Sequence, residues 1–176
     1  MTIAMPTAMD TVVPPILIEL GERIRIRDLV GSIAVGDARS ALALVDGSRL
    51  DRAALGALST QRETSFQLVR QQDLQIILMA WLPGQFGAPQ SHPGSKCDFR
   101  VLKGIATEQR FAMTSGGGVT LIEEDRYLPG SIVSWNSEDI HAMGNDADRV
   151  DLLLTLHVYK PAPIKLNHEL ASGGVL

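Results

Sequence analysis

Three of the four histidines stand in or beside apolar, strand-like stretches, where they could share one site. These are His92, His141 and His157, and a neutral imidazole is a common ligand of transition metals. The segment GAPQSHPGSKC, residues 87–97, adds Gln90 two positions before His92. In an extended segment both side chains would point the same way. A glutamine amide is a weak ligand, so Gln-x-His alone is a poor indication of a metal site.

The last apolar run, VDLLLTLHVY at 150–159, divides into two faces because the side chains of a strand alternate between them. One face is purely apolar. The other ends in Thr155, His157 and Tyr159. Two interpretations stay open: a strand bordering a wet groove, or a hydrogen-bonding relay that points into a cavity. We favour the relay.

The second part of the chain is a series of short apolar runs separated by glycine and proline turn signals, such as Pro129-Gly130. Many short strands at this spacing predict an all-β sandwich or barrel, not an α/β fold. The expected strands lie at 73–81, 98–104, 105–113, 119–124, 131–135 and 150–159.

The first third of the chain has a helical pattern from about residue 16 to residue 58, after a lead-in that ends at Pro14-Pro15. Ser48 stands three residues before Asp51, close to a capping box that would begin a helix at Ser48. We therefore expect three parts: lead-in and helices packed on the barrel (1–64), the barrel with the site (65–163), and a C-terminal tail (164–176).

Charge and cysteine content limit the partners and the compartment. Sixteen basic and twenty acidic side chains give a net charge of −4 without a basic run or stripe, which argues against nucleic acid. A single cysteine cannot form an internal disulfide, which favours a reducing compartment. The N-terminal stretch lacks signal-peptide features, and no apolar run approaches the roughly 20 residues of a membrane helix. We expect a cytoplasmic protein without membrane partners.

The spacing around the histidines resembles the two-motif pattern of the cupin superfamily. That pattern is G-x5-H-x-H-x3–4-E-x6-G followed by P-x-G-x-x-H-x3-N. In this chain Gln90 takes the place of the first histidine and Cys97 that of the glutamate. The gap between Pro129-Gly130 and His141 is longer than in the general form.

Four features resemble the cysteine dioxygenase family, the thiol dioxygenases within the cupins. They cover residues from about 66 to 161. Cys97 occupies the position of the cysteine that cross-links to a tyrosine in some members. The segment WLPGQ at 81–85 resembles the family segment before the metal motif. HAMGN at 141–145 resembles the segment of the third ligand, and LTLHVYKP at 154–161 resembles an S-x-H-x-Y relay.

This resemblance implies a double-stranded β-helix, the cupin jelly roll, with a helical N-terminal extension and the site in its lumen. It implies mononuclear iron(II) held by His92, His141 and whatever Gln90 supplies. The partners would be dioxygen and a small thiol, L-cysteine or a relative, with a sulfinic acid as product. A monomer and a homodimer are both compatible with the sequence.

The resemblance also assigns roles in catalysis to the last strand. His157 would hydrogen-bond Tyr159 and orient it over the metal, and Thr155 would hold His157. Cys97 and Tyr159 could join through a thioether.

Two departures from the family pattern bear on the chemistry. Gln90 replaces a histidine ligand, which weakens the site and makes nickel(II) an alternative to iron(II). Phe66 stands where the family has an arginine that pairs with the substrate carboxylate, and in the pocket it would disfavour a carboxylate there. Arg62 and Arg70 have the strand parity of Phe66, so one of them could replace that arginine, although arginines are mostly solvated. Together with Trp81, these three are the candidate substrate-binding residues.

Three functions stay open. Cys97 and the relay favour a thiol dioxygenase. The changes at Gln90 and Phe66 favour a variant cupin oxygenase that further oxidises the thiol or cleaves a C–C or C–S bond, with nickel as a candidate metal. Loss of one ligand and of the carboxylate arginine would also suit a non-catalytic ligand-binding cupin. The register of Thr155, His157 and Tyr159 leads us to favour the two enzymes.

Overall fold

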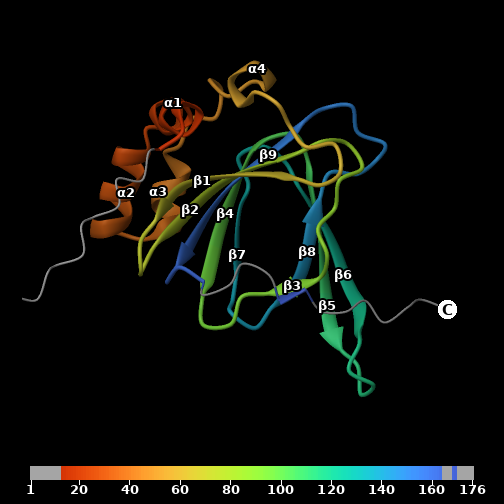
Figure 1. Ribbon diagram of the computed structural model, residues 1–176. Helices are drawn as coiled ribbons and strands as arrows, with labels where there is room; N and C mark the ends of the chain where they lie inside the picture. Colours follow the sequence, from red (N-terminus) through yellow and green to blue (C-terminus); the bar gives the residue numbers. More distant parts are fainter. Residues whose placement is uncertain (1–12, 164–167, 170–176) are drawn as a thin grey trace, which may run out of the picture.

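Two five-stranded antiparallel sheets face each other in the computed structural model, which describes residues 13–163 and 168–169 (Figure 1). In spatial order the first sheet contains β1 (Thr64–Arg70), β2 (Gln75–Trp81), β9 (Leu153–Lys160), β4 (Lys96–Lys103) and β7 (Ile132–Trp135). The second contains β10 (His168–Glu169), β3 (Gln90–Ser91), β8 (Ile140–Gly144), β5 (Ala106–Met113) and β6 (Val119–Tyr127).

All six runs expected to be strands contain one, which confirms a mostly β protein. Two strands between them, β3 and β8, were not predicted, because they are only two and five residues long and show no alternation of polar and apolar side chains. β10 lies in the segment expected to be a tail, and it pairs with β3. Within the described ranges, no helix is both long and apolar enough to cross a membrane.

Four helices precede the strands: α1 (Pro15–Ile24), α2 (Ile26–Val35), α3 (Ala38–Ala43) and α4 (Arg52–Leu55). The expected helix start at Ser48 is wrong. The Asp46 carboxylate accepts a hydrogen bond from the Ser48 backbone N–H at 2.9 Å, which holds Ser48 in a turn. The N-cap is instead Asp51, three residues later, whose carboxylate accepts from the Ala54 N–H, and the helix begins at Arg52.

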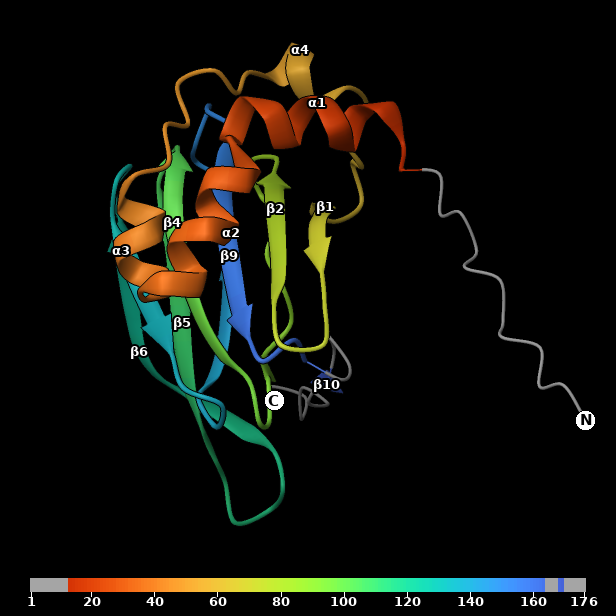
Figure 2. The ribbon, with the colours of Figure 1, turned by 90° about the vertical axis from the view of Figure 1, so that its left-hand side faces the viewer.

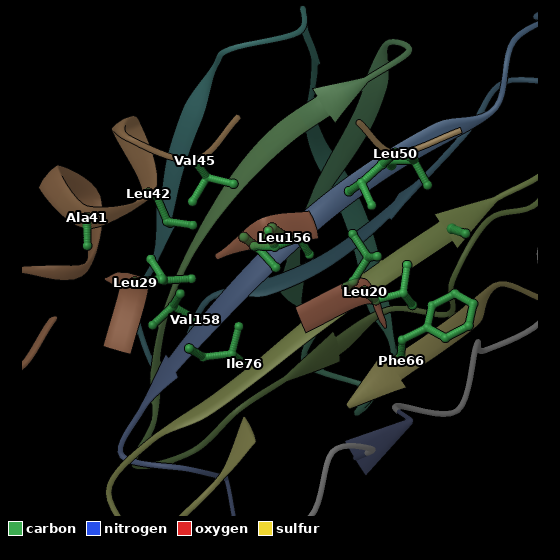
Figure 3. Close-up of a cluster of buried hydrophobic side chains, with 14 of the residues drawn as sticks. Leu20, Leu29, Ala41, Leu42, Val45, Leu50, Phe66, Ile76, Leu156 and Val158 are labelled. Carbon is green, nitrogen blue, oxygen red and sulfur yellow. The ribbon is translucent and has the colours of Figure 1, made fainter. Parts of the chain in front are cut away.

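The helices cover the outer face of the first sheet, as Figure 2 shows for α2 and α3 over β4 and β9. The apolar face predicted for the last strand lies in this layer, where Leu154, Leu156 and Val158 pack with Leu20 and with the helical residues labelled in Figure 3. Burial of this face therefore joins the N-terminal helices to the barrel.

We predict that Leu42→Ala, in this helical layer, lowers the free energy of unfolding by about 2–5 kcal/mol, because the Leu42 side chain is fully buried. The matched control is Leu44→Ala at the end of the same helix, where the leucine is 78% exposed and the expected change is within about 0.5 kcal/mol. Urea denaturation of both variants measures the difference. Equal losses would show that the helices do not pack on the sheet as described.

Candidate active site

A cavity of about 730 Å³ lies between the two sheets. Its wall includes Trp81, Trp135, His157 and Tyr159 from the first sheet and Gln90 from the second. His92, two residues after Gln90, completes this polar part of the wall. The inner face predicted for β9 thus points into a cavity, as the relay interpretation expects.

His92 and His141 form a buried pair of imidazoles whose ring centroids are 5.3 Å apart. Both ring nitrogens of His92 and Nε2 of His141 are buried without a hydrogen-bond partner among the described residues. His141 Nδ1 lies 3.0 Å from the carbonyl oxygen of Asp139, so it donates to that oxygen and leaves the Nε2 lone pair free. An orphaned buried polar atom costs about 1–3 kcal/mol, and a bound metal would remove that cost.

Both imidazoles of the pair are neutral at physiological pH. Burial lowers the pKa of His92 to about 4. Burial also lowers the pKa of His141 to about 3, and the electrostatic effect of His92 makes a smaller contribution to that shift. A neutral imidazole is the form that binds a metal, so the pair is ready to act as ligands.

The pairing of β3 with β8 places Gln90 directly opposite His141. The three candidate ligands, Gln90, His92 and His141, are thus brought to one side of the lumen. Within residues 13–163 and 168–169, no group of three or more His, Cys, Asp or Glu is placed to hold a metal. The Gln90 amide, opposite His141, is therefore the candidate third metal ligand beside the two imidazoles.

The polar groups of β9 form a chain that differs from the expected one. Trp81 Nε1 donates to Thr155 Oγ1 at 3.2 Å, and Thr155 Oγ1 lies 2.9 Å from His157 Nε2. His157 Nδ1 lies 3.8 Å from Cys97 Sγ. The expected contact of Thr155 with His157 is present. The expected hydrogen bond from His157 to Tyr159 is not formed, because both imidazole nitrogens face other partners and the two rings stack with centroids 6.1 Å apart.

The indole of Trp81 fixes the direction of one hydrogen bond in this chain. An indole N–H can only donate, so Thr155 Oγ1 accepts from Trp81. The neutral His157 ring donates from one nitrogen and accepts at the other, so its tautomer sets the direction of its contacts with Thr155 and Cys97.

Cys97 and Tyr159 lie directly opposite each other on the paired strands β4 and β9. Burial raises the pKa of both groups, and the interaction with Cys97 raises that of Tyr159 further. Both groups are therefore uncharged at neutral pH. This juxtaposition is the one that the family resemblance implied.

Of the four candidate substrate-binding residues, Trp81 and Arg62 line the cavity. The Gln85 amide donates to the carbonyl of Arg62, and also to that of Ser59, at 2.9 Å each, which holds the segment before β1 against the cavity. Arg70 instead donates to the carbonyl oxygen of Pro163 and does not line the cavity.

The expectation that Phe66 lies in the pocket is wrong. Phe66 pairs opposite Leu78 and packs with it in the core under the helices (Figure 3). The parity argument does not apply to Arg62, because Arg62 precedes the strand. It does not apply to Arg70 either, because a register shift between Gln67 and Val69 breaks the alternation before that residue. Phe66 therefore does not hinder a carboxylate in the cavity.

Other residues near the site carried no recognised signal in the sequence. Trp135 lines the cavity and stacks on His141, and Glu108 is buried beside it. Gln85 stands in the WLPGQ segment, whose resemblance marked its place but not its contacts.

Comparison with known proteins gave matches in structure alone. No family model matches the chain, and no curated protein matches it. The TT1209 protein of Thermus thermophilus superposes with a TM-score of 0.52 and 22% identity, over 65% of this chain and 97% of its own. A protein with a double-stranded β-helix domain from Klebsiella pneumoniae gives a TM-score of 0.51 and 16% identity, over 65% and 85%.

The fold is the double-stranded β-helix of the cupins. The jelly roll with N-terminal helices, implied by the resemblance, is thereby confirmed as the fold. Because fold alone does not define activity, the reaction has to be argued from the cavity and its side chains.

We predict that the purified protein binds about one transition-metal ion per chain, since two neutral imidazoles with unpartnered nitrogens meet here. His92→Ala or His141→Ala should weaken binding by more than the roughly 10–100-fold caused by loss of an outer-shell partner. His157→Ala is the matched control, because His157 is equally buried but directs its nitrogens at Thr155 and Cys97. Metal analysis after anaerobic incubation with iron(II) or nickel(II) tests this, and a metal-free wild-type chain would contradict it.

Proposed function

We propose that this protein is a metal-dependent thiol dioxygenase that adds dioxygen to the sulfur of L-cysteine or a related small thiol. The observation that carries the proposal is the pair of neutral, unpartnered imidazoles at a cavity whose wall includes His92, Tyr159 and Arg62. The reaction R–SH + O₂ → R–SO₂H places both oxygen atoms on sulfur. It therefore needs no external reductant.

The residues present fit a mononuclear metal. His92 and His141 would hold it through imidazole nitrogens, and Gln90 is the candidate third ligand through its amide oxygen. Iron(II) is the expected ion, and nickel(II) is the alternative because an amide oxygen replaces a nitrogen donor. When bound, the ion supplies the activation of dioxygen and a binding position for the substrate sulfur.

The chain's own side chains would orient the thiol. Arg62 would pair with a substrate carboxylate, as guanidinium groups do at carboxylate-binding sites. The two hydrogen bonds from Gln85 hold the segment that contains Arg62 in place. Tyr159 keeps its phenolic proton, because burial raises its pKa, and it can donate a hydrogen bond to oxygen or sulfur in the cavity.

The first test is oxygen uptake with a panel of thiols, using iron(II)- and nickel(II)-loaded protein. A sulfinic acid product supports a thiol dioxygenase. A cleaved carbon skeleton would instead support the variant oxygenase. An absence of uptake with either metal would leave a ligand-binding cupin.

We expect Arg62→Ala to lower kcat/KM for carboxylate-bearing thiols by about 10- to 100-fold, since a hydrogen bond to a charged group contributes about 1.5–3 kcal/mol. The effect should vanish for a thiol without a carboxylate. Arg70→Ala is the matched control, because its guanidinium contacts Pro163 outside the cavity wall. Equal effects of the two substitutions would refute the role of Arg62.

Cys97 and Tyr159 are also proposed to form a thioether during turnover, since they face each other across paired strands. The S–H bond and a ring C–H bond break, a C–S bond forms, and dioxygen accepts the two electrons and two protons. We predict that intact mass falls by two hydrogens in the wild-type chain and stays unchanged in Cys97→Ala and Tyr159→Phe. An unchanged wild-type mass after turnover, with Cys97 fully alkylated in denaturant, would contradict the thioether.

A further inference from the structure

Trp135 forms the layer behind His141. The indole and imidazole rings stack with centroids 3.7 Å apart and planes 20° from parallel. Trp135 is the last residue of β7 in the first sheet, whereas His141 belongs to β8 in the second. The contact therefore crosses the lumen and relates the two sheets at the imidazole pair.

Glu108 holds the indole from the side. It is a fully buried residue of β5, and its carboxylate accepts hydrogen bonds from Trp135 Nε1 and, at 2.7 Å, from the Tyr127 hydroxyl. Arg110 Nε lies 3.4 Å from the same carboxylate and supplies the opposite charge. A buried carboxylate is tolerated only when its lone pairs are satisfied in this way, so removal of one donor would leave an expensive unpaired charge.

These contacts restrict the His141 ring from two directions. The Asp139 carbonyl fixes its Nδ1 edge, and the Trp135 indole covers one face. Nε2 is the remaining polar atom, and it has no partner among the described residues. A ring fixed at one edge and one face presents that nitrogen in a single direction, which lowers the entropy lost when it binds a ligand.

We propose that Glu108 and Trp135 are positioning residues for His141, which hold its imidazole so that Nε2 faces the metal. This inference rests on the metal site of the proposed function. Neither residue is a proposed ligand, because the Trp135 indole N–H only donates and the Glu108 carboxylate accepts from Trp135 and Tyr127. Their effect on metal binding passes through the stacked ring.

The test is nickel(II) binding to the full chain, measured by competition with a chelator. Glu108→Gln and Trp135→Phe should each weaken binding by about 10- to 100-fold, the range for outer-shell partners. The double variant should lose about as much as the larger single effect, because both substitutions act through one contact. The absorption bands of bound nickel should also shift, since a moved ligand changes the coordination geometry.

Asp98→Asn is the matched control. The Asp98 carboxylate also accepts a hydrogen bond from β7, donated by Ser134 on the paired strand. Cys97 and Trp135, the residues before Asp98 and after Ser134, face the lumen. Because side chains alternate along a strand, Asp98 and Ser134 point to the outer face. This variant should bind nickel within about two-fold of wild type. A purely structural effect of losing a carboxylate bond at β7 would appear in the control as well.

The outcomes separate this inference from the proposed function. Wild-type chain that binds no metal would overturn both. Folded Glu108→Gln and Trp135→Phe variants that bind within about two-fold of wild type, or a strictly additive double variant, would overturn only the positioning role. If Glu108→Gln fails to fold, Trp135→Phe decides, because it keeps Glu108 with its Tyr127 and Arg110 partners.

Discussion

The burial of β9 on both faces is the constraint on which the rest of the structure depends. Every residue from Leu153 to Tyr159 is buried, although the strand carries a threonine, a histidine and a tyrosine. The outer apolar face needs a cover, which the N-terminal helices supply. The inner face must satisfy its buried polar groups, and side chains from the neighbouring strands contribute partners.

The strands beside β9 meet this requirement through their register. β2 brings Trp81 to donate to Thr155, and β4 brings Cys97 next to His157 and opposite Tyr159. The polar groups of β9 thus have partners within the first sheet. The imidazoles of His92 and His141, on the other side of the lumen, keep nitrogens without partners among the described residues. This contrast between a satisfied relay and an unsatisfied pair distinguishes a structural network from a candidate ligand set.

The sequence was informative where a local period or a fixed spacing determines the geometry. The alternation in β9 predicted both its faces. The family resemblance, and not a local period, implied the pairing of Cys97 with Tyr159. Phe66 was misplaced because its position came from the resemblance, whereas its side chain packs in the core under the helices. Parity failed for Arg62 and Arg70, since a loop precedes β1 and a register shift follows Gln67. The contact of Glu108 with Trp135 joins residues 27 positions apart on different sheets, and no local pattern records such a pairing. Local periodicity thus identified the site residues on one strand, while contacts across the lumen required the structure.

Burial also sets the charge of the site. It lowers the pKa of His92, His141 and His157. It raises the pKa of Cys97 and Tyr159, so these groups are all neutral near pH 7. The buried charge of Glu108 is already offset by Arg110. A divalent ion held by two imidazoles and an amide would therefore keep its full charge of +2 in a medium of low dielectric constant. An anionic ligand is the simplest way to reduce that charge. A substrate thiolate would do so at the ion, and a carboxylate would balance the charge of Arg62. The neutrality of the ligand set thus favours the same class of substrate as the position of Arg62.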